Sequence, residues 1–431
     1  MIAFLATFVA VAGALYVGFR LRVGDLEDRL VRDANSIVGA PKTRPLHVDR
    51  GEPGSLGQAL GKHLPSLGRA RKTDANDESS TAALREVLGG ERPLSDLPNC
   101  YSRVLIELKD DLDGVLLATH AESADLASAD DAFDPAPGVS WLDYQFGAWL
   151  TGIRVRKSLA EGNTAEAARD CLDGLALARD SAVSGGLIGH LIGVLIIERL
   201  GPACAAALAA LPENQRPDSM ARLRQVRNAV PGFEVTMREE AVQVQLSFLG
   251  PQLGESFRSR LRDRPKLMAK GWGNPVMDEK TWGRRLLNRA LWRDRQAIYD
   301  RLVTNAALRG PERDAAFEAH AAEVGGRLLV ASELPKPADY LRYAQRAEVG
   351  TLRLDLIVIA GAAKSFRAAY GVWPASVSAL ANEGFLTSEE VLRDARVQLE
   401  PGAGGRLDIV LPLQPELEGA PKEARLNLEA Q

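Results

Sequence analysis

An uninterrupted apolar run near the start of the chain constrains its fold and location more than any other feature. Residues 2–19, IAFLATFVAVAGALYVGF, carry no charge, and the run stops at Arg20 and Arg22. Eighteen helical residues rise about 27 Å, which is close to the hydrocarbon thickness of a bilayer. We therefore predict a single transmembrane helix, with residues 1–22 as a membrane anchor.

A cleaved secretory signal is the alternative interpretation of this run. Residues 10–12 and 12–14, AVA and AGA, are small-residue segments of the kind that precede a cleavage point. The missing basic n-region and the length of the apolar run favour the uncleaved anchor. By the positive-inside rule, the arginines after the run predict a cytoplasmic body. These arginines are Arg20, Arg22, Arg29 and Arg32.

The composition is that of an ordinary globular protein with more than one domain. The chain has 431 residues, of which 46% are hydrophobic, and a net charge of −4, so nothing attracts it globally to nucleic acid or anionic lipid. Cys100, Cys171 and Cys204 are odd in number and lack CxxC spacing. They predict neither a zinc site nor a disulfide framework. We expect small buried hydrophobes, with one disulfide only in an oxidising compartment.

Sequence pattern divides the remainder into three regions. Residues 23–98 are rich in Gly, Pro, Ser and basic residues, which is typical of a stalk and flexible linker with one short helix at Ser79–Leu88. Residues 99–334 have helical periodicity and predict an α-helical body. Residues 335–431 predict a tail with a long helix and a β-hairpin. The predicted fold class is therefore mainly α with a small α+β tail.

The body begins with one amphipathic helix from Tyr101 to Leu116, whose acidic cluster at 110–113 we interpret as a solvated face. A large apolar helix from Trp141 then ends at Gly162, and an Ala-rich helix follows, capped by Thr164. This arrangement resembles a tetratricopeptide-type helical hairpin. The next helix is predicted at Leu187–Leu200. Its apolar run ends at Glu198 after eleven residues, which is too short to span a bilayer, so we predict a buried central helix that contains a packed His190.

A basic segment with interspersed aromatic residues is the main candidate surface. Residues 251–300 hold twelve Lys and Arg against six Asp and Glu, together with three tryptophans. A plain amphipathic helix is the preferred interpretation, and contact with lipid headgroups is favoured over single-stranded nucleic acid. The candidate contact residues are Arg284, Arg285, Arg289, Trp292 and Arg293.

The tail carries the most specific motif of the chain. A long helix from Ala338 to about Tyr370 is followed by Gly371, which allows a left-handed turn, and by Trp373 and Pro374. Ser376 is placed to cap a short helix that reaches Leu380. Alternating apolar residues on both sides of PGAGG at 401–405 predict a β-hairpin that packs on the long helix.

This order of elements resembles the globular end of major type II secretion pseudopilins, and the tails of bacterial membrane-anchored helical proteins with Ala-rich hairpins. The resemblance covers roughly residues 340–412, and its signature residues are Tyr370, Gly371, Trp373 and Pro374. The N-terminal segment lacks the Gly-Phe processing site and the glutamate of pilin assembly. The resemblance therefore implies a shared tail architecture in the cell envelope rather than a pilin subunit.

Two classes of function follow from these patterns. The first is a membrane-anchored helical scaffold or protein-interaction protein of the bacterial inner membrane, single-pass, which contacts the bilayer through residues 2–19 and protein partners through its helices. The second is an enzyme whose site is assembled from distant residues, or an accessory protein of secretion. No GxSxG, HExxH, Walker or dinucleotide fingerprint is present. We therefore predict no catalytic residue, cofactor or metal ligand.

Overall fold

The computed structural model describes much of the chain, and its helices and strands confirm a mainly helical fold with a small antiparallel sheet near the C-terminus. The anchor predicted at residues 1–22 lies outside the described residues. The described ranges are 25–37, 52–73, 78–126, 138–249, 259–261, 282–325, 335–393, 396–402, 405–412 and 423–428. Unit 1 comprises Met1–Pro41, Ser128–Asp134 and Met237–Pro337, and unit 2 comprises Lys42–Ala127, Pro135–Thr236 and Ala338–Gln431.

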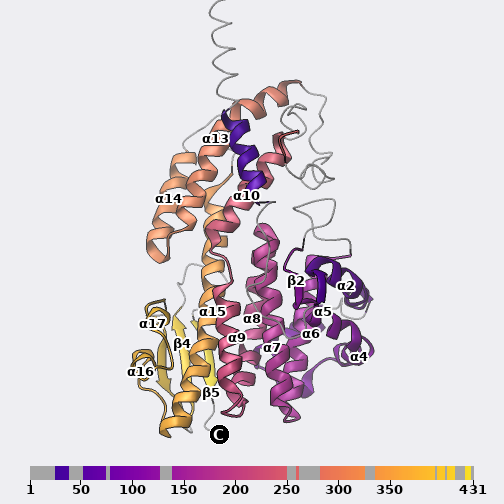
Figure 1. Cartoon of the computed structure of the whole chain (residues 1–431), viewed down its shortest axis with the longest axis vertical. Helices are drawn as coiled ribbons and strands as arrows, with labels where there is room; N and C mark the ends of the chain where they lie inside the picture. The colour runs from indigo at the N-terminus through magenta and orange to yellow at the C-terminus, as the bar shows by residue number, and fades with distance from the viewer. Residues whose placement is uncertain are drawn as a thin grey trace, which may run out of the picture. The chain divides into compact units, whose positions relative to one another are not determined.

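Three consecutive helices form the centre of unit 2: α6 (Trp141–Ala160), α7 (Thr164–Ser184) and α8 (Gly186–Ala210). In Figure 1 they lie between α2, α4 and α5 on one side and α15 with the sheet on the other. The predicted end of α6 is confirmed, because Gly162 has a φ of 81° in the turn to α7. Asn163 rather than Thr164 occupies the N-cap of α7, so this detail of the prediction is wrong by one residue.

Helices α7 and α8 approach each other closely at a two-glycine turn. Gly186 has a φ of 54°, a left-handed conformation that suits glycine. Along α8, a Cβ atom on Gly189 would lie 2.3 Å from the backbone oxygen of Ser181, and a Cβ on Gly193 would lie 2.5 Å from that of Ala178. Both distances are below van der Waals contact. The α7–α8 interface therefore depends on glycine at these positions.

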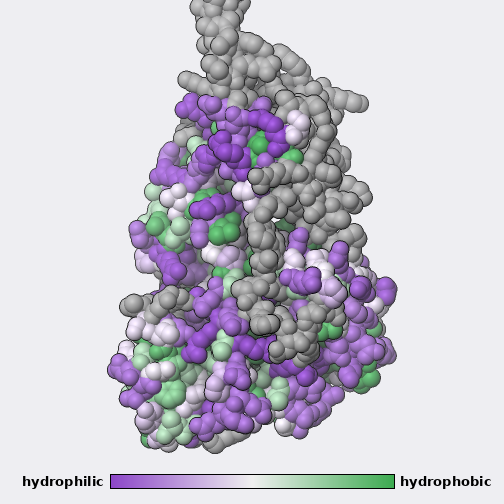
Figure 2. All heavy atoms as spheres, viewed as in Figure 1, coloured by the Kyte–Doolittle hydropathy of each residue, from purple (hydrophilic) through white to green (hydrophobic). Residues whose placement is uncertain are grey.

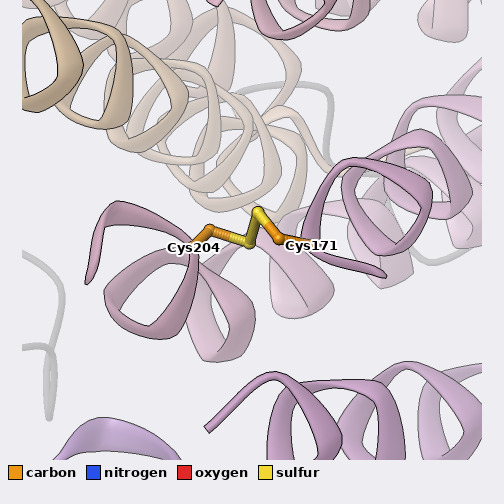
Figure 3. The surroundings of a disulfide bond; sticks show 2 residues. All are labelled: Cys171 and Cys204. Carbon is orange, nitrogen blue, oxygen red and sulfur yellow. A yellow bond between two sulfur atoms is a disulfide. The ribbon is translucent and has the colours of Figure 1, made fainter. Parts of the chain in front are cut away.

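A disulfide joins the same two helices further from the turn. Cys171 of α7 and Cys204 of α8 are bonded across the interface, with their Cα atoms 5.3 Å apart and a sequence separation of 33 (Figure 3). Both side chains are fully buried. The predicted burial of these two cysteines is confirmed, but they form the one disulfide that the sequence left open instead of remaining unpaired, and Cys100 is free. Closing a loop of this length removes unfolded-state entropy worth about 4 kcal/mol in the chain-entropy model.

Helix α8 is longer than predicted, and its environment identifies it as a core helix. It extends to Ala210, and in the described part of the chain it is the one helix with the length and hydropathy of a candidate membrane span. Two thirds of that apolar window, 67%, is buried inside the protein. Glu198 of α8 forms an ion pair with Arg353 of α15, whose Nη1 lies 3.2 Å from the Glu198 Oε2. The predicted role as a buried central helix fits this packing.

The linker prediction is wrong for residues 52–73, which form β1 (Glu52–Ser55) and α2 (Leu56–Thr73). The short helix predicted at Ser79–Leu88 is confirmed as α3 (Glu78–Gly89), and a 3-10 turn follows at Leu94–Asp96. Helix α2 contains four glycines and prolines, but its leucines recur at helical spacing and are fully buried. These are Leu56, Leu60, Leu64 and Leu67. Apolar periodicity thus outweighs the unfavourable helix propensity of Gly and Pro.

The helix predicted over residues 101–116 is divided in two. Helix α4 (Asn99–Glu107) ends at Leu108, whose φ of −112° and ψ of 28° are not helical, and α5 (Lys109–Ala118) follows. The solvated-face interpretation is confirmed for Asp110 and Asp113, which are exposed, whereas Asp111 is only partly exposed. Asp111 accepts from His63 Nδ1 at 3.1 Å, and Asp113 pairs with Arg154 of α6. Strand β2 (Ala121–Ser123) then pairs in parallel with β1.

The C-terminal part of unit 2 packs a long helix on the core and adds a sheet. Helix α9 (Arg216–Asn228) contacts α7, and its Arg227 pairs with Asp355 of α15 (Pro337–Tyr370), Nη2 to Oδ2 being 2.7 Å. The predicted span of the long helix is confirmed. After α16 (Val377–Asn382) and α17 (Ser388–Arg393), three antiparallel strands follow. They are β3 (Gln398–Pro401), β4 (Leu407–Pro412) and β5 (Glu423–Leu428).

The predicted hairpin is confirmed as β3 and β4, in which Leu399 pairs with Ile409. Strand β5 extends it, with Leu407 opposite Leu428 and Leu411 opposite Ala424. Alternate residues of β5 are buried, so its inner face joins the core of unit 2.

Unit 1 is a helical assembly of its own. It contains a helix at residues 25–37, most of α10 (Phe233–Leu249), α13 (Trp282–Ala306) and α14 (Gly310–Gly325). Arg29 donates through both terminal nitrogens to the Asp300 carboxylate, at 2.9 and 2.5 Å. Such bidentate pairing fixes the 25–37 helix on α13.

Replacement of Gly189 tests the α7–α8 interface. We expect Gly189→Ala to lower the free energy of unfolding by roughly 1–3 kcal/mol, because the new methyl group meets a backbone oxygen that cannot rotate away. Gly201→Ala is the matched control on the same helix, since its Cβ would meet only Ile357 Cδ1 at 3.7 Å. Urea denaturation of both variants measures the difference. Equal stabilities would contradict the close approach of the two backbones.

Candidate functional site

The end of α15 presents a group of aromatic and apolar side chains that we call the aromatic corner: Phe366, Tyr370, Val372, Trp373 and Phe385. Gly371 ends the helix with a φ of 74°, and the chain then turns back. Pro374 is buried, and the Ser376 side chain accepts a hydrogen bond from the Ala379 amide at 3.1 Å to start α16. This confirms the predicted cap. The local sequence thus fixes the backbone on both sides of residues 370–373.

Trp373 connects the long helix to the sheet. The indole Nε1 donates to the carbonyl oxygen of Gly405 at 2.7 Å, in the turn between β3 and β4. The guanidinium of Arg367 lies 4.4 Å from the centroid of the Trp373 ring, and the Lys364 ammonium lies 5.7 Å from it. Both distances are within the range of cation–π attraction. Trp373 is half-buried, so it is held on one side while its remaining surface faces solvent.

Three aromatic rings of the corner form a cluster around Phe366. Its centroid lies 4.6 Å from that of Tyr370 and 5.7 Å from that of Phe385. The Tyr370 hydroxyl donates to the Glu383 carboxylate at 2.5 Å, and this hydrogen bond raises the pKa of Tyr370 above its usual value. The same hydrogen bond orients the Tyr370 ring.

The corner is also exposed. Tyr370 is 50% exposed and Val372 is 61% exposed. Figure 2 shows apolar surface among polar surface over the part of the molecule that contains α15–α17 and the sheet. Tyr, Trp and Arg on a rigid support are the residue types that dominate binding energy in protein interfaces. The arrangement is suited to binding a protein segment.

The predicted basic contact surface of α13 is only partly described. The side chains of Arg284, Arg285 and Arg289 lie outside the described residues. Arg293 is exposed, but the assignment of Trp292 to a surface contact is wrong. The Trp292 ring is fully buried, and its Nε1 donates to Gln245 of α10 at 3.0 Å. An indole with an internal acceptor satisfies its polar group inside the protein.

A buried histidine–aspartate pair is the second candidate, and the sequence analysis missed it. Nε2 of His120, between α5 and β2, lies 2.8 Å from Oδ1 of Asp173 on α7, and both residues are nearly inaccessible. His120 Nδ1 has no hydrogen-bond partner in the described part of the chain. A base oriented by a carboxylate is one component of nucleophilic catalysis. No nucleophile accompanies it within the described ranges, because no hydroxyl or thiol group there is hydrogen-bonded to Nδ1.

Two further groups have displaced pKa values. Burial lowers the pKa of His190 on α8 to about 4, and its Nδ1 lies 2.9 Å from the Thr236 hydroxyl. Burial also raises the pKa of Glu240 on α10 to about 7. The prediction that His190 is a packed, hydrogen-bonded residue is confirmed. Among the described residues, no group of three or more His, Cys, Asp or Glu side chains is placed to hold a metal ion.

Comparison with known proteins adds no family to these observations. No protein-family model, curated protein or solved structure matches the chain. The resemblance of the tail to secretion pseudopilins therefore stays a prediction, and functional inference depends on the geometry of the chain itself.

Replacement of Trp373 tests the connection between α15 and the sheet. We expect Trp373→Ala to lower the free energy of unfolding by about 2–3 kcal/mol, through lost ring burial and cation–π contacts. Trp373→Phe keeps a ring and loses the hydrogen bond to Gly405, for which we expect about 1 kcal/mol. Urea denaturation measures both values. Two variants as stable as the parent chain would show that the ring does not support the tail.

The displaced pKa values predict opposite pH effects on stability. Glu240 is protonated in the folded chain between its ordinary pKa of 4.5 and about 7, so its contribution to the free energy of unfolding falls as the pH rises through that window. His190 is neutral when folded between about 4 and its ordinary 6.5, so its contribution rises with pH. Each amounts to roughly 3 kcal/mol.

We therefore expect the two effects to compensate largely in the parent chain and to separate in single variants. Glu240→Gln should become more stable as the pH rises from 4 to 7, and His190→Asn should become less stable. Urea denaturation at four pH values measures the slopes. Identical pH profiles for the parent and both variants would contradict the assignments.

Proposed function

We propose that the chain is a membrane-anchored helical protein-interaction protein of the bacterial cell envelope, and that it binds a protein partner at the aromatic corner. The observation that carries this proposal is the exposure of Tyr370 and Val372 on a support fixed by Gly371, Trp373 and Glu383. Rigid aromatic groups lose little conformational entropy on binding. The corner is therefore preorganised for association.

The charged groups of unit 2 support the proposed scaffold role, because they connect its helices to one another. Buried aspartates of α7 connect helices: Asp170 accepts from Arg154 of α6 at 2.8 Å, and Asp173 bonds His120. Arg227 and Asp355 connect α9 to α15. These pairs hold the architecture and are largely shielded from solvent. The exposed aromatic corner is accessible without rearrangement of any of them.

The membrane part of the proposal is supported by sequence. Residues 2–19 have the length and composition of a single span in the inner membrane, and the α6–α7 hairpin has the large-then-small pattern of tetratricopeptide-type repeats. An anchored scaffold needs only one span and a binding surface. The proposal therefore requires no catalytic group.

Site-specific photo-crosslinking tests the binding surface. A photoreactive residue at Val372 should give a discrete crosslinked product in membranes of producing cells, because this side chain is 61% exposed beside the ring cluster. The same residue at the exposed Asp110 of α5 is the matched control. Tyr370→Ser should reduce the Val372 product several-fold, whereas Tyr370→Phe should retain it. No product at Val372, or equal products at both positions, would overturn the proposal.

A further inference from the structure

We propose that a disulfide donor oxidises Cys171 and Cys204, and that unit 2 therefore folds on the oxidising, extracytoplasmic side of the membrane. The inference rests on the proposed membrane-anchored function and adds the side on which the partner is met. It reverses the cytoplasmic placement that the positive-inside rule predicts from the arginines at 20–32.

The first argument is the bond itself. Cys171 and Cys204 belong to different helices and are 33 residues apart, and their Cα separation of 5.3 Å lies in the normal range for a disulfide (Figure 3). Thiol-reducing systems keep cysteines reduced in the cytosol of ordinary cells, whereas disulfides persist in the periplasm and other oxidising compartments. A covalent link in the central hairpin therefore indicates where the body assembles.

The second argument is burial. Both sulfur-bearing side chains are 0% exposed, so neither is accessible to a macromolecular donor or to glutathione after folding. Thiol–disulfide exchange requires a thiolate to reach a disulfide sulfur directly. The bond must therefore close while the core around α7 and α8 is still open. This assigns a structural role to the bond, and it excludes the ready reversibility of a redox switch.

The chemistry is a two-step exchange. The thiolate of one cysteine attacks the donor disulfide, forming a mixed disulfide and releasing one donor thiolate. The thiolate of the other cysteine then attacks the sulfur of its partner in that mixed disulfide and releases the second donor thiolate. Two cysteine thiols are oxidised, the donor disulfide is reduced to a dithiol, and the two cysteine protons pass to solvent or to the donor thiolates.

Cys100 provides an internal reference for the test. It lies on α4, is partly exposed and is free. Its thiol should accept an alkylating reagent whether or not the other two cysteines are bonded. The number of reagent molecules added to the chain therefore reports the state of Cys171 and Cys204 directly.

The experiment counts accessible thiols in the full chain. Producing cells are quenched and their proteins precipitated with acid, which keeps thiols protonated and stops exchange. The denatured full chain is then treated with a maleimide–polyethylene glycol reagent before or after reduction. We expect one addition before reduction and three after it. Cys100→Ser should take none before reduction and two after it. Cells that lack the donor pathway should yield the parent chain with three additions without reduction.

Two results would overturn the inference. Three additions to the parent chain before reduction would show that the thiols are free in cells, and two additions to Cys100→Ser before reduction would show that Cys171 and Cys204 are not joined. Failure of the proposed function is seen separately, as loss of the chain from alkali-washed membranes or of the crosslink at Val372. Either loss leaves the thiol count readable.

Discussion

The architecture of unit 2 depends on the close approach of α7 and α8. Glycines at 189 and 193 bring the two backbones together near the turn, and the Cys171–Cys204 bond holds them further along. Helix α7 presents the aspartates that bond α6 and His120, and α8 provides Glu198 for Arg353 of α15. A shift of one helix against the other would misalign each of these pairs, so the polar contacts follow from the glycine contacts.

The aromatic corner depends on this core indirectly. The apolar centre of α15, around Ile357 and Ala360, is fully buried in the core of unit 2, which fixes the direction of the helix end. Gly371 then stops the helix, and Trp373 attaches the turn to Gly405. The two cation–π contacts of Trp373 and its hydrogen bond to Gly405 are enough to hold the turn, because the core already fixes the helix that precedes it. Exposed rings at this position therefore retain a defined orientation without a partner.

Sequence pattern predicted the elements whose signals are local. The span of α15, the glycine at 371 and the serine cap at 376 each follow from neighbouring residues. Helix α2 was missed because glycine and proline content received more weight than the spacing of its leucines. Trp292 was misassigned because its acceptor, Gln245, lies 47 residues away. The cysteine pairing and the Trp373–Gly405 contact depend on tertiary geometry, which one sequence without an alignment does not reveal.

The choice between a binding protein and an enzyme depends on which polar groups serve the fold. Asp170, Asp173 and Asp355 all bond partners on other elements, so their burial is explained by structure. His120 Nδ1 differs from these carboxylates, since it is one of several buried side-chain atoms with no hydrogen-bond partner in the described ranges. A general base must lie within hydrogen-bonding reach of the substrate proton that it removes. The His120 imidazole is nearly inaccessible, so a substrate does not reach it in this conformation. The exposed side chains of Tyr370 and Val372 are accessible to a partner with a complementary surface. The exposure of these side chains is thus the physical basis of the proposed association.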